Sequence, residues 1–242
     1  MPRSSNSDGA GELLDGLVAR CPFPAPGSMA DCAFSGGADS TALLALARHA
    51  GITVTAHHVD HGLRDESGAE AERARDIAGG LGVEFVLHTP ALEVGPNLEA
   101  RAREARRACL GDGAMTGHTA DDQAETVILR LLRGAGSTGL AAIEPGPTHP
   151  LLALRRAETV AVCGALGIDP VQDPTNERRD VWRNRVRAEV LPLLADVAGR
   201  DPAPILARTA DLLREESALI DELAAGIDPT DAVAVASAPR VL

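Results

Sequence analysis

The chain has 242 residues, a formal net charge of −12, an apolar fraction of 45% and a charged fraction of 24%. These values describe an ordinary globular protein with a sizeable core, and they argue against disorder and a disulfide-stapled miniprotein. No apolar run approaches the roughly 20 residues of a membrane span. The acidic charge argues against RNA binding over the whole surface, although clusters of arginines can still form local basic patches.

Missing residue types exclude two kinds of chemistry. Lysine and tyrosine are absent, so all 23 basic residues are arginines. A Walker A loop and Schiff-base catalysis both need a lysine, and neither can operate here. The four cysteines form no Cys-x-x-Cys pair, which favours reduced structural thiols over a zinc or iron–sulfur site. The N-terminal residues lack a secretory signal, and we expect a cytoplasmic protein.

Hydrophobic periodicity predicts strands and helices that alternate along the first half of the chain. A short helix at 13–18 comes first, followed by a break at three prolines. Strands are then expected at 29–34, 52–59, 83–88 and 114–117, and helices at 41–50, 67–81, 97–110 and 120–133. Beyond a glycine-rich stretch at 134–139, further helices are expected at 155–166, 186–197 and 205–223.

This order of elements indicates an α/β fold, a doubly wound and mostly parallel sheet with a C-terminal helical extension. We expect an N-terminal helix and linker at 1–28, the α/β domain at 29–150, and a peripheral helical region at 151–242. The last region ends within an apolar and basic phrase, so we expect either a short form or a truncated chain.

A hexapeptide of small and hydroxyl residues joins the first strand to its helix, Ser35-Gly36-Gly37-Ala38-Asp39-Ser40. Phosphates bind at this position of a doubly wound sheet, where glycines admit an anion and helix amides point at it. Asp39 would repel a bare phosphate, so we expect it to hold the Mg²⁺ that accompanies a nucleoside triphosphate. The alternative is a tight turn in which Ser40 only caps the helix.

Two polar segments are expected at the same edge of the sheet. The second strand ends in His57-His58-Val59-Asp60-His61-Gly62-Leu63-Arg64, where Asp60 and His61 are candidate substrate contacts and a merely polar strand end is the alternative. The fourth strand leads into Gly117-His118-Thr119-Ala120-Asp121-Asp122-Gln123-Ala124-Glu125-Thr126. Helical spacing would place His118, Asp122 and Glu125 on one face, where the two carboxylates could bind an amine. The alternative for the acidic residues is stabilisation of the helix dipole.

A third segment runs from Asp173-Pro174-Thr175-Asn176 to Arg183-Asn184-Arg185-Val186-Arg187. It predicts a turn and a helix start whose arginines contact phosphates, and a solvated helix face is the alternative.

The hexapeptide resembles the pyrophosphate loop of the N-type ATP pyrophosphatases, which works through backbone amides and needs no lysine. From Ser35 to Leu194 the segments together resemble the tRNA(Ile)-lysidine synthetases, with further matches at Asn97-Leu98-Glu99, Ala102-Arg103-Glu104 and Leu131-Leu132-Arg133-Gly134. Members of that family use ATP to activate the C2 carbonyl of the wobble cytidine in an isoleucine tRNA with a CAU anticodon. The amine of free L-lysine then attacks this carbon, which forms lysidine.

The resemblance implies an adenine nucleotide alpha hydrolase-like fold and a role for each matching residue. Ser35 to Ser40 would bind the ATP pyrophosphate, with Asp39 near Mg²⁺. Asp122 and Glu125 would hold lysine, and His118 and Arg103 would lie near the reacting phosphate and base. Arg183, Asn184 and Arg187 would face the tRNA.

The chain departs from the family pattern at two positions. His149 precedes Pro150-Leu151-Leu152 where an arginine is usual, and Arg107 stands where an aromatic residue is usual. Many members also carry C-terminal domains that grip the tRNA. The oligomeric state does not follow from the sequence.

Two other classes of function stay open. Another ATP-using enzyme of the same superfamily, such as a tRNA thiolase or an amide-forming synthetase, would share the hexapeptide. The missing Cys-x-x-Cys pairs and the lack of a glutaminase-like segment count against it. A regulatory nucleotide-binding module would need Ser35 to Ser40 but would have no use for His118, Asp122 and Glu125.

Overall fold

The computed structural model describes residues 4–62, 67–91, 98–172 and 181–228, together with 230, 237 and 239. Its contacts divide the chain into two units. Unit 1 comprises Met1–Ala120 and Pro145–Asn176, and unit 2 comprises Asp121–Glu144 and Glu177–Leu242. Each unit is described by itself.

The centre of unit 1 is a parallel sheet. Its strands β1 (Met29–Ala33), β2 (Thr53–Val59) and β3 (Glu84–His88) lie in the order β1-β2-β3. The fourth predicted strand, at 114–117, is reduced to one parallel bridge between Cys32 and Met115, in which Ala33 N donates to Met115 O at 2.8 Å. This bridge lies on the edge of β1 opposite β2, so the strand order reverses at β1. Ligands bind at such a reversal in doubly wound sheets.

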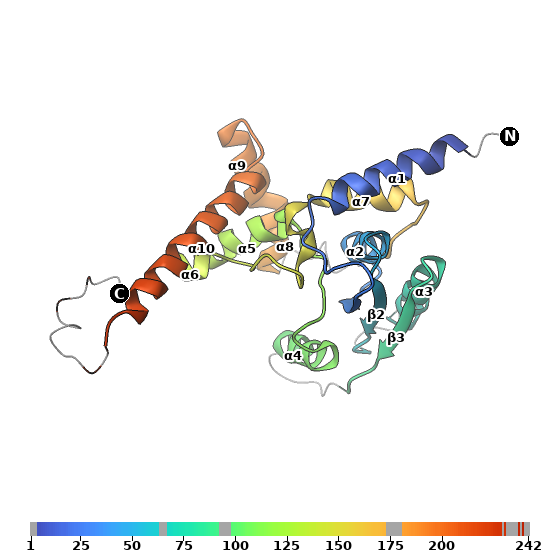
Figure 1. The fold of residues 1–242 in the computed structure, drawn as a ribbon, viewed down its shortest axis with the longest axis horizontal. Helices are drawn as coiled ribbons and strands as arrows, with labels where there is room; N and C mark the ends of the chain where they lie inside the picture. Colours follow the sequence, from blue (N-terminus) through green and yellow to red (C-terminus); the bar gives the residue numbers. More distant parts are fainter. Residues whose placement is uncertain are drawn as a thin grey trace. The chain divides into compact units, whose positions relative to one another are not determined.

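Helices cover the sheet of unit 1. Helix α2 (Ala38–His49) packs on β1 and β2, and residues 40–47 are buried throughout. Figure 1 shows α1 (Ser4–Val18) alongside α7 (Arg156–Ala165), and both helices contact α2. Helix α3 (Ser67–Gly80) contacts β2 and β3, and α4 (Leu98–Leu110) contacts β1 and β2. The predicted mostly parallel α/β fold is therefore confirmed.

The core of unit 1 follows the alternation of the strands. Val54 and Ala56 on β2 are buried with the leucines of α2, and Leu151 and Leu154, in and after the 3₁₀ turn Pro150–Ala153, are fully buried in the same cluster. Cys32 is also fully buried, and this burial raises the pKa of its thiol to about 12. A thiol that stays protonated fits the predicted structural role.

Unit 2 is helical. Helix α5 (Ala120–Leu132) enters it, followed by the short α6 (Ser137–Leu140) within the predicted glycine-rich loop. The predicted helix at 186–197 begins earlier, because α8 (Trp182–Arg185), a π-helical turn (Val186–Val190) and α9 (Leu191–Ala198) follow one another without a break. Helix α10 (Ala203–Ala225) packs against α6. Arg214 of α10 donates to the carbonyls of Ala141 and Ile143 at 2.6 and 2.9 Å.

A small core of Ile128, Leu129 and Val186 holds α5 to the helix that starts at Trp182. Among the described residues, no helix combines the length and apolar character needed to cross a membrane.

Candidate functional site

The hexapeptide of unit 1 forms a compact loop between β1 and α2. The hydroxyls of Ser35 and Ser40 lie 3.2 Å apart, and Ser40 Oγ donates to Gly37 O at 3.0 Å. Thr41 Oγ1 donates to Gly36 O at 3.2 Å. The hydroxyls thus bind the loop's own carbonyls and fix its shape, while α2 begins at Ala38 directly behind it. This is the loop-and-helix arrangement that receives phosphates.

Two glycines are required for close backbone packing around this loop. Gly36 has φ +81°, and a Cβ there would lie 2.7 Å from Val171 Cγ2. A Cβ on Gly117 would lie 2.8 Å from the carbonyl carbon and oxygen of Asp39. Gly117 follows the Met115 bridge, so the segment from the fourth predicted strand passes directly against the loop. The predicted meeting of these two motifs at one sheet edge is correct.

Asp39 is held from α7, which the sequence did not indicate. Thr159 Oγ1 donates to Asp39 Oδ1 at 2.5 Å, and Arg156 Nε donates to Asp39 Oδ2 at 3.3 Å. Thr159 is fully buried, and the Asp39 side chain is 26% exposed. The carboxylate is therefore oriented by a hydroxyl and a guanidinium three residues apart on one helix face. No motif marks Arg156 or Thr159 in the sequence, because a polar helix face is usually a solvated one.

His118 does not lie on the helix that follows it, because α5 begins at Ala120. Helical spacing therefore does not relate His118 to Asp122, which corrects that part of the sequence argument. Within unit 1, His118 Nδ1 lies 2.7 Å from Thr116 Oγ1, and its ring is 5.4 Å from that of His149. The unusual His149 is thus a neighbour of the predicted catalytic histidine.

Asp60 and His61 follow the end of β2, at the predicted edge. Asp60 Oδ1 accepts from Gly62 N at 2.8 Å and closes a tight turn. Both ring nitrogens of His61 are buried and have no hydrogen-bond partner in the described structure. Burial lowers the pKa of His61, and the positive charge of Arg106 lowers it further. Buried polar atoms without partners are uncommon in native structures and suit a ligand contact.

His57 and His58 take structural roles on opposite faces of β2. His57 lies between Asp31, at 3.0 Å from Oδ1, and the ring of His88, at 2.9 Å. His58 contacts the carbonyl of Phe34 at 2.9 Å. Burial lowers the pKa of His58. Leu63 and Arg64 lie outside the described residues.

In unit 2, the predicted amine-binding carboxylates lie in a buried ionic network. Glu125 is fully buried and accepts from Arg187 Nε at 2.7 Å, from Arg187 Nη2 at 3.1 Å and from Arg183 Nε at 2.8 Å. Arg183 Nη2 also donates to Asp122 Oδ1 at 3.1 Å. The predicted lysine contacts and two of the predicted tRNA contacts are therefore bonded to one another. Each arginine side chain stays about one third exposed, at 34% and 33%.

The remaining predicted residues are described less fully. Asn184 lies in α8 between the two arginines. Arg103 lies in α4, but its side chain is outside the described structure, as are residues 173–176 of the Asp-Pro-Thr-Asn segment.

Most of the chain matches a known protein family. Residues 21–194 match the family of PP-loop domains, a range that includes the loop at 35–40, the acidic pair and the arginines that bind it. The chain belongs to the PP-loop domain family. The family is ATP-utilising, which implies the use of ATP.

Curated relatives of this PP-loop chain are nearly half identical to it over the aligned region. It is 47% identical over 205 residues to a tRNA(Ile)-lysidine synthase of Nocardia farcinica, which covers 81% of this chain and 64% of that protein. It is 46% identical over 205 residues to a tRNA(Ile)-lysidine synthase of Mycobacterium leprae, which covers 80% and 63%. The chain therefore spans less than two thirds of the length of these relatives.

A solved structure shows the same fold. The U34-tRNA thiolase NcsA from Methanococcus maripaludis, with its [4Fe-4S] cluster, superposes with a TM-score of 0.65 at 16% identity. The match covers 88% of this PP-loop chain and 81% of the thiolase, and it supports the predicted adenine nucleotide alpha hydrolase-like fold.

Proposed function

We propose that this chain carries the catalytic part of a tRNA(Ile)-lysidine synthase. It would use ATP to join L-lysine to the wobble cytidine of the CAU anticodon in an isoleucine tRNA, in the cytoplasm. The observation that carries the proposal is the 47% identity to a curated enzyme of that name over 81% of the chain. The loop and the acidic pair supply two sites that such a reaction needs, one for a triphosphate and one for an amine.

In the first step, the C2 carbonyl oxygen of the cytidine would attack the α-phosphorus of ATP, and pyrophosphate would leave. Charge grows on the phosphate oxygens in this step, and the backbone amides of residues 36–40 can stabilise it without moving. His118 and Arg103 are proposed to lie beside the reacting groups, with His149 as the neighbour that restricts the His118 ring. Asp60 and His61, whose ring nitrogens are buried, are proposed substrate contacts.

Asp39 fits the role of a Mg²⁺ ligand by its chemistry. Mg²⁺ takes hard oxygen ligands, and Asp39 offers a carboxylate that is partly exposed and fixed by Thr159. When bound, the ion would offset the negative charge of the triphosphate. Arg156 shares this task, because its guanidinium already lies beside the same carboxylate.

In the second step, the lysine amine would attack C2 and pass a proton to a nearby carboxylate, and AMP would leave with the oxygen that C2 had carried. We propose that Asp122 and Glu125 orient the amine. In the structure, both carboxylates accept hydrogen bonds from arginines, so the ammonium of lysine would compete with Arg183 at Asp122, the more accessible of the two, whose side chain is 10% exposed. Glu125 is enclosed, so its contribution to orienting the amine would pass through Arg183, which it holds beside Asp122.

The decisive experiment measures pyrophosphate release and incorporation of radiolabelled lysine into an isoleucine tRNA with a CAU anticodon. The wild type is compared with Asp122→Asn, which keeps the shape of the side chain, and with Glu216→Gln on the exposed face of α10 as a control. We expect incorporation by the wild type and the control, and loss in Asp122→Asn. Lysine-independent pyrophosphate release with a different acceptor would point to another PP-loop enzyme, and ATP binding without turnover would point to a regulatory module.

A further inference from the structure

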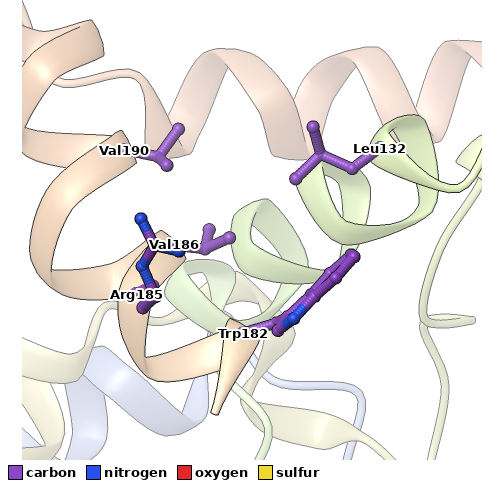
Figure 2. Close-up of a pocket in the computed structure, with 5 residues that line it drawn as sticks. All are labelled: Leu132, Trp182, Arg185, Val186 and Val190. Atoms are coloured by element: carbon purple, nitrogen blue, oxygen red, sulfur yellow. The ribbon is translucent and has the colours of Figure 1, made fainter. Parts of the chain in front are cut away.

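An open apolar groove lies in unit 2, beside the ionic network. It has a volume of about 280 Å³ and is lined by Leu132, Trp182, Arg185, Val186 and Val190. Figure 2 shows the Trp182 ring on the same side as Leu132, with the other three side chains across from them. Trp182 is 60% exposed and Leu132 is 61% exposed. Two large apolar side chains thus face solvent around one hollow.

The helix that carries Trp182 supplies four of the five residues that line this groove. Trp182, Val186 and Val190 are spaced by four residues, and the π-helical turn at Val186–Val190 has more residues per turn than an α-helix. The wider turn keeps residues four apart on one face. Because Arg183 and Arg187 bind Glu125, the same helix is also held to α5 by buried charge-assisted bonds.

Arg185 places a guanidinium group, paired with Glu189, at the rim of the groove. Its Nε and Nη2 donate to Glu189 at 3.1 and 2.9 Å, and this hydrogen bond raises the pKa of Arg185. A guanidinium carries five N–H groups, and these two bonds use only two of them. The side chain is 58% exposed. An indole ring can stack on an unpaired base, and an arginine beside it can bind the phosphate of that nucleotide.

We propose that this groove stacks a single unpaired base of the RNA substrate, next to the nucleotide that reacts. The inference rests on the proposed function, because it takes Asp122 and Glu125 as the amine site. Leu132 lies seven residues beyond Glu125 on α5, which is about 10 Å along the helix axis. A loop nucleotide that flanks the wobble position spans such a distance. Five residues line the groove, whereas a stable protein interface takes in about 20–30 residues a side.

Trp182 provides its own readout. It is the only tryptophan in the chain, and tyrosine is absent. The intrinsic tryptophan fluorescence of the protein therefore reports on this groove alone. We expect an RNA stem-loop with a CAU anticodon to quench this fluorescence as it binds. A series of stem-loops with one abasic position each should locate the stacked nucleotide, because only one of them would fail to quench.

Three variants separate stacking from apolar contact and from charge. Trp182→Leu removes the stacking contribution to binding and should weaken stem-loop affinity by about 5- to 150-fold. Trp182→Phe keeps an aromatic ring and should retain most of the affinity. Arg185→Gln should weaken binding and reduce its dependence on salt. The control, Arg208→Gln on the exposed face of α10, should do neither.

The outcomes distinguish this inference from the function on which it rests. Lysidine formation by the wild type, together with full stem-loop affinity in Trp182→Leu and no quenching, overturns the groove assignment and leaves the enzyme assignment standing. If the fluorescence is quenched without RNA as the protein concentration rises, the groove is a self-association surface, and the RNA assignment of the groove is overturned. Absence of lysine incorporation, with quenching intact, would refute the proposed reaction but support the RNA groove.

Discussion

The buried network of unit 2 leads to a sharp prediction about two arginines on one helix. Arg187→Leu removes two charge-assisted hydrogen bonds from the fully buried Glu125. Such bonds contribute about 1.5–3 kcal/mol each, and removing one partner of a buried ion pair costs about 3–5 kcal/mol. Because Arg183 still donates to Glu125, we expect unit 2 to lose about 3 kcal/mol of its free energy of unfolding.

The assay is urea unfolding followed by the fluorescence of Trp182, which reports on unit 2. With an m-value of about 1–3 kcal/mol/M, the midpoint should fall by about 1–3 M. The matched control is Arg185→Leu, which removes an exposed ion pair with Glu189 from the same helix and should leave the midpoint almost unchanged.

A double variant tests the cause. If the loss arises from an uncompensated buried charge, Arg187→Leu combined with Glu125→Leu should unfold at a higher urea concentration than Arg187→Leu alone. Equal midpoints for Arg187→Leu and Arg185→Leu would refute the reasoning, because burial would then make no difference.

Three further predictions concern unit 1. Gly117→Ala should push the backbone of Asp39 and weaken ATP binding at least tenfold by calorimetry, whereas Gly113→Ala, with open space around it, should bind like the wild type. Thr159→Val should lose about 1 kcal/mol of stability and weaken ATP binding, because the hydroxyl that donates to Asp39 is removed. Thr159→Ser keeps a hydroxyl and should retain both stability and binding. Equal behaviour of the two variants would show that this hydrogen bond is irrelevant. Because burial lowers the pKa of His58, the unfolded chain binds its proton more readily, so stability should fall as the pH drops below about 6.5; a His58→Gln variant with the same pH dependence would contradict this.

The sequence by itself determined the features that depend on neighbouring residues. The loop at residues 35–40 is contiguous, and its shape follows from glycines and hydroxyls that bond within six residues. The alternation of strands and helices is also local, and parallel strands bring their carboxyl ends to one edge whatever else the chain does. The meeting of Gly117 with Asp39 could therefore be predicted from the order of elements. The prediction was least accurate at 114–117, where the expected strand is reduced to a single bridge.

Only the tertiary structure decided which charged groups meet. Glu125 and Arg187 lie 62 positions apart, and Asp39 and Thr159 lie 120 apart. In the sequence, each residue is equally compatible with a solvated helix face, because charge and spacing say nothing about distant partners. Burial turns these groups into a network, since a carboxylate removed from water must find donors. The same packing leaves Trp182 exposed beside that network, a consequence that no local pattern contains.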